Sequence, residues 1–291
     1  MKTFAEYLAE NLIDVDKSDI DKIYTPLKSV MKDLTAVWDR NFKRLQAAQD
    51  TVTRIAISRT FSREFKEAIS NAGGGINQPL KIIKSSELKS ENAKIAHAAN
   101  PIEIWVWLVH KSNQYSPQDK RIHICLPDSV YFSMVDSGVH QVPANLLPSL
   151  RSEVSELKYK ATIRHELTHW MDDSLHNFHL SKGINTAISH LRAGNSKAAQ
   201  QTYKRMVLGK ENDIYMTHIE ITPMVNQIAE YKRRVSKKQW DSMTWTDLVV
   251  ALPSLGGLNY MHGEAWRKKM FDRLSRENLL GPNFRKSVAG P

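Results

Sequence analysis

The chain has 291 residues, a formal net charge of +10 and a hydrophobic fraction of 41%. No stretch approaches the roughly 18 consecutive apolar residues of a membrane-spanning helix, so we expect no membrane partner. Cys125 is the only cysteine, which excludes an internal disulfide and a zinc site built from several thiolates. The N-terminal segment carries acids and lacks the apolar centre of a secretion signal. We therefore expect a reducing, cytoplasmic setting, or the host cytoplasm or virion if a phage encodes the chain.

The positive charge favours acidic partners, such as nucleic acid or an acidic protein. The densest basic segments lack the interleaved aromatic residues of a nucleic-acid-binding platform. The same charge is therefore also typical of a protein whose basic helix faces are simply solvated. An acidic partner or nucleic acid stays an open alternative, and the sequence does not indicate an oligomeric state.

Residues 1–72 are predicted to form two or three helices. Apolar residues recur there at intervals of three and four, at Ile23, Leu27, Val30, Leu34, Val37 and Leu45. The Gly-rich run from Asn71 to Gly75 then marks a boundary. We expect an N-terminal helical region over 1–72, a second domain over 76–280 and a tail over 281–291.

Three segments of the second domain have the β-branched and aromatic character of strands: Leu80–Lys84, Ile102–Val109 and Arg121–Leu126. The polar stretch Lys111–Lys120 resembles a long hairpin connection, which predicts a small antiparallel sheet. After Gly183 helical patterns return at about 184–208, 216–236 and 260–278. The fold class expected from these elements is α+β and mostly helical.

The motif His165-Glu166-Leu167-Thr168-His169 lies in a predicted helix that begins near Ser149 or Ser152 and runs to about His176. Residues four apart lie on one face of a helix, so both imidazoles can reach one zinc ion. Glu166 is then placed to take a proton from a water molecule on that ion. The alternative is a buried helix whose histidines bond to backbone carbonyls.

A catalytic zinc site requires a third protein ligand and one open position. The extended metzincin motif would need Gly at 172 and His at 175, whereas this chain has Asp172 and Leu175, so that class is excluded. Asp172, three residues after His169, is placed to orient an imidazole.

Tyr215, Glu220, Pro223 and Ile228, together with the HExxH helix, resemble the gluzincin class of zinc metallopeptidases, especially its small phage and bacterial members. The resemblance implies a zincin-like core, in which the sheet packs on the HExxH helix. It also implies Zn²⁺ held by His165, His169 and Glu220, with Glu166 as the general base. The long interval between His169 and Glu220 departs from the compact members and requires an inserted helical hairpin at about 184–208.

His262-Gly263, followed by Trp266 and Met270, resembles the element that supplies the third zinc ligand of SprT-like proteases. Under either assignment the expected activity is hydrolysis of a protein or peptide by a zinc-activated water, without a covalent intermediate. Arg121–Leu126 or Ile102–Val109 would provide a place for an extended peptide if it forms an edge of the sheet; the alternative is that the strand is internal. The alternative functions are a non-catalytic zinc-binding protein and a basic nucleic-acid-associated or structural protein that uses the HExxH helix for packing.

Overall fold

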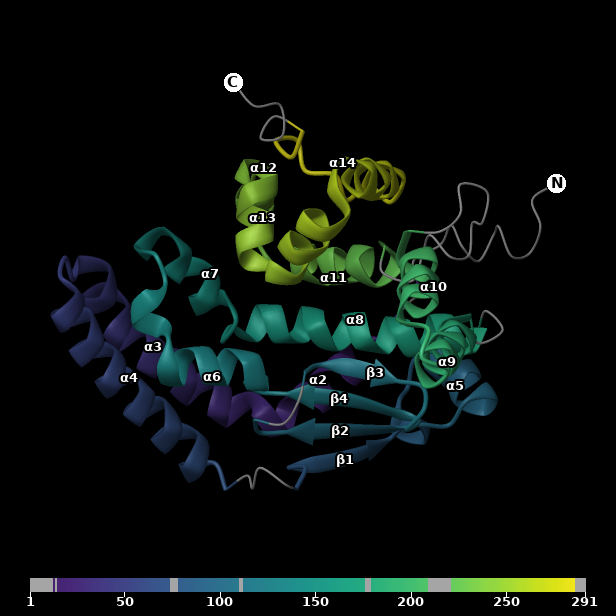
Figure 1. Ribbon diagram of the computed structural model, residues 1–291, viewed down its shortest axis with the longest axis horizontal. Helices are drawn as coiled ribbons and strands as arrows, with labels where there is room; N and C mark the ends of the chain where they lie inside the picture. The colour runs from purple at the N-terminus through teal and green to yellow at the C-terminus, as the bar shows by residue number, and fades with distance from the viewer. Residues whose placement is uncertain are drawn as a thin grey trace.

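The computed structural model describes residues 13, 15–73, 78–109, 112–175, 179–208 and 221–285; within these, the side chains of 179–181, 183–184, 203–208, 253–254 and 256–265 are not described. The described chain is mostly helical and contains a four-stranded sheet, so the predicted fold class is confirmed at this level (Figure 1). None of the described helices combines the length and apolar character needed to cross a membrane.

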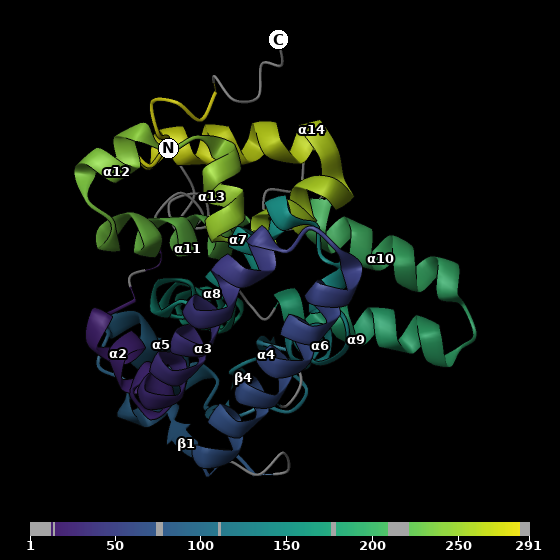
Figure 2. The same cartoon turned by 90° about the vertical axis from the view of Figure 1, so that its left-hand side faces the viewer.

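The N-terminal part forms α2 (Lys17–Tyr24), α3 (Lys28–Ala47) and α4 (Thr51–Asn71), which confirms the prediction of two or three helices there. Asp50 caps α4, because its side chain accepts a hydrogen bond from the Thr53 amide at 2.8 Å. Helices α3 and α4 pack against each other as a pair (Figure 2). Residues 1–12 and 74–77 lie outside the described part of the chain.

The sheet consists of β1 (Lys81–Lys84), β2 (Glu103–Trp107), β3 (Gln114–Ser116) and β4 (Arg121–Cys125), in the order β1-β2-β4-β3. The expected antiparallel arrangement is wrong for its central pair, because β2 and β4 run parallel. The reason lies in the connection that we took for a hairpin loop. It contains β3, which forms a tight hairpin with β4 and occupies the sheet edge, so that β4 enters beside β2 in the same direction.

One face of the sheet is apolar and fully buried, with side chains from Ile83, Ile104, Val106, Ile122 and Ile124. They share a hydrophobic core with apolar side chains of α2, α3, α4 and α8 (Glu156–Leu175). Strand alternation places every second residue on this face, which explains why the intervening Trp105 and His123 lie on the other. The core is therefore continuous from the N-terminal helices to the sheet.

Helix α8 begins later than expected, because Leu147–Ser152 forms a separate short helix, α7. The Ser155 hydroxyl accepts a hydrogen bond from the Lys158 amide at 3.1 Å and thereby caps α8. Val154, between the two helices, is fully buried and anchors the connection. The prediction that the HExxH helix begins near Ser149 or Ser152 is therefore wrong, because both residues lie in α7.

The chain continues with α9 (His179–Arg192) and α10 (Ser196–Leu208), which pack as a hairpin that projects to one side (Figures 1 and 2). This confirms the inserted helical hairpin that we predicted at about 184–208, although its first helix begins earlier, at His179. Gly194, whose φ of +74° suits glycine, lies in the turn. Helices α5 (Glu91–Ala99) and α6 (Ser129–Ser137) complete the sheet-containing part.

The C-terminal part comprises α11 (Ile221–Arg234), α12 (Lys237–Ser242), α13 (Trp245–Ala251) and α14 (Pro253–Arg276). We expected the last helix to begin at about residue 260, but α14 already begins at Pro253, a residue suited to a first helical turn. These helices form a second core, to which α8 contributes Ala161. Phe284 is fully buried beside Trp240 and Trp245, so the packed chain extends beyond Gly281, where we expected a tail.

Candidate metal centre

Helix α8 lies between the sheet and α11 (Figure 1) and is buried at every residue from Lys158 to Met171. Its apolar side chains belong to both cores. The same segment nevertheless carries a row of polar side chains at helical spacing: Lys158, Thr162, His165, Glu166 and His169. Buried polar groups cost free energy unless they are paired, so the arrangement of this row requires an explanation.

The two histidines of the motif point toward each other. Their Nε2 atoms are 3.0 Å apart, and the rings meet edge to face at 79° with centroids 4.6 Å apart. Two imidazole nitrogens that share a tetrahedral zinc at about 2.0–2.1 Å each are roughly 3.3 Å apart. The observed separation therefore suits one shared cation after a small opening. It also suits a hydrogen bond in which one imidazole donates to the other.

Glu166 is held by the edge strand of the sheet. Its Oε2 accepts a hydrogen bond from the Tyr115 amide at 2.8 Å. The Tyr115 hydroxyl donates to Asp173 at 3.0 Å and accepts from the Asn100 side-chain amide at 3.0 Å. Tyr115 thus connects β3 to α8 at two points seven residues apart. This contact fixes the position of Glu166 relative to both histidines.

Helix α11 is bonded to the opposite side of α8. Arg164, which is 1% exposed, reaches the Glu230 carboxylate and the Asn226 side-chain oxygen, both at 3.2 Å. Glu230 also binds Arg234, at 2.5 Å. Further along α11, Arg234 binds Asp21 of α2 at 3.7 Å, and Lys160, one turn before Arg164 on α8, binds the same carboxylate at 2.7 Å. Higher numbers on α11 therefore match lower numbers on α8, and the helices run antiparallel. The N-terminal end of α11, at Ile221, consequently lies toward the His169 end of α8.

A cavity of about 220 Å³ opens beside the motif. It is lined by Ser112, Asn113, Asp128, Glu153, Lys158, Thr162, His165, Glu166 and Gln227. These residues come from the segment before β3, the start of α6, α8 with its preceding turn, and α11. The first histidine and the glutamate of the motif therefore face a space that a substrate group could enter.

The third metal ligand is not identified in the described part of the chain. Glu220, our first candidate, lies outside the described residues. His262, the second, lies in α14, which packs against α11 and α13, and its side chain is not described. No group of three potential metal ligands occurs among the described residues. The described donor set, two convergent imidazoles with one open side, fits a zinc ion that takes its third ligand from elsewhere in the chain.

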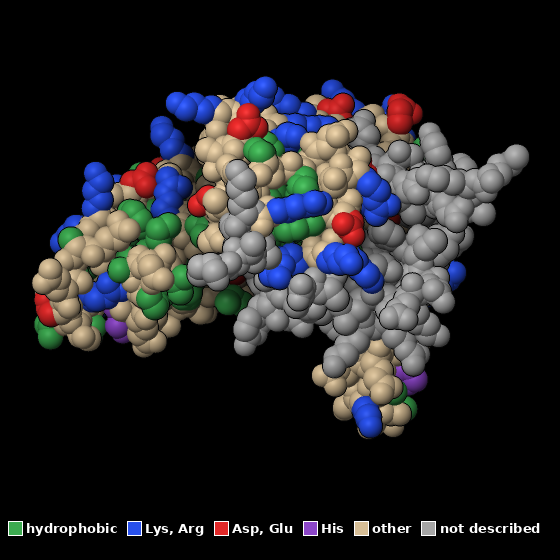
Figure 3. Space-filling view, turned by 90° about the horizontal axis from the view of Figure 1, so that it is seen from above, with side chains coloured by type: hydrophobic (Ala, Val, Ile, Leu, Met, Phe, Trp, Pro, Cys, Tyr) green, Lys and Arg blue, Asp and Glu red, His purple; other side chains and the backbone are tan. Residues whose placement is uncertain are grey.

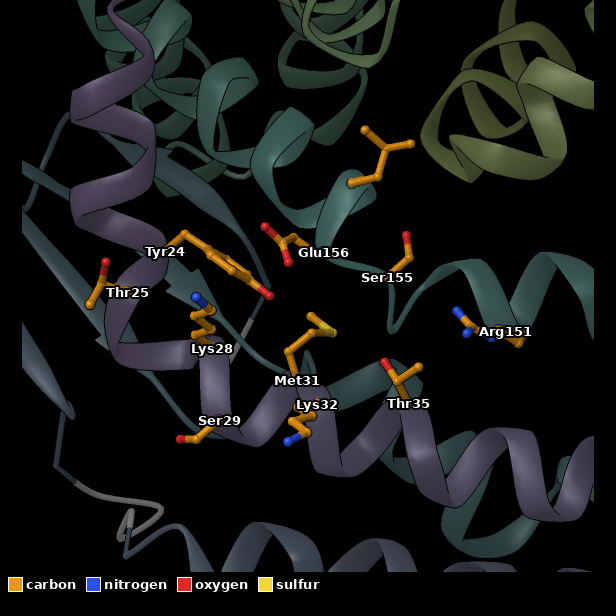
Figure 4. A pocket seen from close by; sticks show the side chains of 11 residues that line it. Tyr24, Thr25, Lys28, Ser29, Met31, Lys32, Thr35, Arg151, Ser155 and Glu156 are labelled. Carbon is orange, nitrogen blue, oxygen red and sulfur yellow. The ribbon is translucent and has the colours of Figure 1, made fainter. Parts of the chain in front are cut away.

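A larger groove of about 820 Å³ lies between α2, α3 and the start of α8 (Figure 4). Tyr24, Met31 and Leu157 supply apolar lining, and Lys28 and Lys32 are exposed beside them. The acid in this groove, Glu156, already binds Lys160 at 2.6 Å. The groove has no histidine in its lining, so its chemistry differs from that of the smaller cavity.

Several residues of the site were absent from our sequence-based prediction. Tyr115 lies in a strand of only three residues, too short for a recognisable pattern. Asp173, and not Asp172, makes the described bond to Tyr115. Asn226 and Glu230 are four residues apart and therefore share one face of α11, which is the sequence feature that could have indicated a common partner such as Arg164.

Basic side chains are dispersed over the one face of the molecule that Figure 3 shows. Figure 3 shows Lys and Arg side chains spread over the face seen from above, with Asp and Glu side chains between them. Within α14, Lys268 and Lys269 are exposed while Arg273 is buried. On the face seen in Figure 3, the described Lys and Arg side chains do not gather into a single patch.

Comparisons with protein-family models, with curated proteins and with solved structures found no significant match for this chain. Function is therefore argued from the site itself.

Proposed function

We propose that this chain is a zinc-dependent metallopeptidase with a gluzincin-like site. The observation that supports the proposal is the convergence of His165 and His169 on one point, 3.0 Å between their Nε2 atoms, with Glu166 beside the first histidine and a cavity in front. A zinc ion at this point would polarise the substrate carbonyl and lower the pKa of a water molecule to about 7. We also propose that the sheet and the HExxH helix together form a zincin-like core.

In this mechanism Glu166 accepts the proton of the attacking water and passes it to the leaving amine. The hydrogen bond from the Tyr115 amide orients the carboxylate and leaves its other oxygen for the proton. β3 is the edge strand on this side of the sheet, whereas Arg121–Leu126 and Ile102–Val109, which we had considered as edges, contain the two inner strands. An extended peptide alongside β3 would pair with it away from the Tyr115 amide, which already donates to Glu166. Protein or peptide substrates are therefore the proposed class.

Glu220 is the proposed third ligand. It directly precedes α11, whose first turn lies toward the His169 end of α8. Gln227, which lies seven residues later, lines the cavity. Seven residues are about two helical turns, so Glu220 would share a face with Gln227 if α11 began at or before Glu220. His262 is the alternative ligand, since α14 packs on α11.

The Glu166→Gln variant tests the mechanism. Glutamine keeps an oxygen for the Tyr115 amide but cannot take a proton, so we expect normal zinc content and a loss of hydrolysis of about 10²–10⁴-fold. Glu91→Gln, at an exposed position of α5, is the matched control and should keep full activity. Peptide cleavage and zinc content should be measured on the same preparations. Equal cleavage by Glu166→Gln and the unaltered protein would show that Glu166 is not the base.

One alternative uses the same geometry. Because Glu166 is already bonded to β3, its role can be structural. The HExxH helix would then bind zinc without catalysis, or serve only to pack the sheet against α11. Zinc content together with cleavage of a peptide library separates the two functions: retained zinc without cleavage favours the non-catalytic protein. A salt-dependent gel shift tests the remaining alternative, a basic nucleic-acid-associated protein.

A further inference from the structure

The cavity beside the metal centre has an unusual lining for a substrate pocket, because every described residue in it is polar or charged. Small-molecule pockets are mostly apolar and measure about 300–1,000 Å³. This cavity, at about 220 Å³, is smaller and suits a single side chain. A polar lining of this kind must be matched by a polar group of the ligand, since desolvated polar groups that are left unpaired oppose binding.

The cavity extends from the motif toward the start of α8. Glu166, Thr162 and Lys158 succeed one another at intervals of one turn, so the row covers roughly 12 Å along the helix axis. At its far end lie the charged groups of Asp128, Glu153 and Lys158. A substrate side chain that enters beside the metal centre must be long to reach them.

The balance of these three charges is negative. The Lys158 ammonium, with its side chain only 8% exposed, is bound by the Glu153 carboxylate at 2.5 Å, so these two charges neutralise each other. Asp128 adds a further negative charge. One of its oxygens caps α6 by accepting from the Tyr131 amide at 2.9 Å, and its carboxylate lines the cavity. The described residues beyond the metal centre therefore carry one net negative charge.

We propose that this cavity is a specificity pocket for a basic side chain, lysine or arginine, of the substrate next to the bond that is cleaved. Asp128 and Glu153 are its specificity-determining residues, and Lys158 limits its negative charge. The inference rests on the proposed peptidase function for the identity of the ligand. The charge selection itself depends only on the cavity.

The test measures binding separately from catalysis. The zinc-loaded Glu166→Gln protein is titrated by calorimetry with three blocked tripeptides, Ala-Xaa-Ala, in which the central residue is lysine, leucine or glutamate. We expect the lysine peptide to bind about tenfold more tightly than the glutamate peptide, with leucine between them. Tenfold corresponds to about 1.4 kcal/mol, which a single unscreened charge contact can supply.

A series of charge variants in the same background then makes the prediction quantitative. Asp128→Asn and Glu153→Gln should each abolish the preference for lysine, and the double variant should prefer glutamate. Lys158→Gln should increase the preference for lysine. Asparagine retains the cap of α6, so the Asp128 variant should fold normally. Asp33→Asn, at an exposed position of α3, is the matched control and should change nothing.

Equal affinity for the three peptides would overturn the inference, and so would a lysine preference that survives in the double variant. Should the double variant fail to fold, the two single variants still decide, because each must lose the preference. Cleavage of the same peptides by the unaltered protein gives the second readout. Cleavage without charge preference would refute the pocket and leave the peptidase, whereas selective binding without cleavage would refute the peptidase and leave the pocket.

Discussion

At the scale of single residues, the buried charges of α8 are matched one by one. Lys158 meets Glu153, Arg164 meets Glu230, and Glu166 meets the Tyr115 amide. His165 and His169 differ in that they face each other across 3.0 Å. Two neutral imidazoles that both present a lone pair at this distance would repel each other, so either one ring donates a hydrogen bond to the other or a cation lies between them. The zinc content of the protein distinguishes these two states.

The sequence alone predicted that His165, Glu166 and His169 share one helix and one face, because helical periodicity links residues four apart. It could not predict Tyr115 or Asp128, since their roles depend on chain segments that only the fold brings to α8. For the third ligand the sequence offered two candidates, Glu220 and His262. The described residues do not decide between them, so this part of the site stays a prediction.

The third ligand can be assigned by comparing Glu220→Ala with His262→Ala. If Glu220 binds the metal, its removal should weaken zinc binding at least tenfold, because one of three protein ligands is lost. His262→Ala should then bind zinc like the unaltered protein. Competition with a coloured zinc chelator measures both affinities. The reverse result would transfer the ligand role to His262.

At the scale of secondary-structure elements, the pairing of α8 with α11 rests on a buried ionic network. Arg164 and Glu230 are 1% and 2% exposed, and Arg234 extends the network to Asp21 of α2. Burial by itself raises the pKa of Asp21. The Lys160 hydrogen bond and the charges of Lys160 and Arg234 lower this pKa by more than burial raises it, so the carboxylate stays ionised. Three helices are thereby fixed around the HExxH motif.

Arg164→Met should destabilise the protein by about 3 kcal/mol, because it leaves the buried Glu230 with fewer partners. Arg63→Met removes an exposed i,i+4 pair, whose side chains are 70% and 63% exposed, and should cost less than about 1 kcal/mol. Urea unfolding of both variants measures the free energies. Similar small losses in the two variants would show that the network is not important for stability.

The elements themselves were largely predictable. The helices at 17–71 follow from apolar periodicity, and the hairpin before α11 was expected from the long interval between His169 and Glu220. The direction of β4 did not follow, because the three-residue strand β3 has no detectable pattern and its insertion at the sheet edge reverses the expected pairing. The late start of α8 also escaped prediction, since Ser149, Ser152 and Ser155 are equally good caps and only packing chooses among them.

At the scale of the whole molecule, α8 joins two cores. One contains the N-terminal helices and the sheet, and the other contains α11 to α14. A helix that is buried on all sides can hold functional groups rigidly, which a catalytic site requires. The sequence did not indicate that the two sides of α8 pack into separate cores.

The acid stability of the molecule should depend in part on Asp136, which connects α6 to α4. The Lys66 ammonium and the Ser62 hydroxyl, both at 2.6 Å, hold its pKa below the usual 3.8. A carboxylate whose pKa is lower in the folded protein adds stability above that usual value, and this stability is lost as the pH falls through the folded pKa.

Asp136→Asn should therefore lower the melting temperature at pH 7 by about 1–3 °C, a small effect because the pair is partly exposed. The difference between the variant and the unaltered protein should shrink as the pH falls below about 4. Thermal unfolding of both proteins from pH 7 to pH 3 measures it. A difference that stayed constant over this range would mean that the ionised carboxylate is not responsible.

The most direct test of the account is the zinc content of the purified chain, measured by elemental analysis after dialysis against a weak chelator. We predict about one zinc per chain for the unaltered protein and almost none for His165→Ala and His169→Ala, with Asp33→Asn unchanged. Zinc that is absent from the unaltered protein, or retained in full by both histidine variants, would contradict the proposal that these two imidazoles share a metal ion.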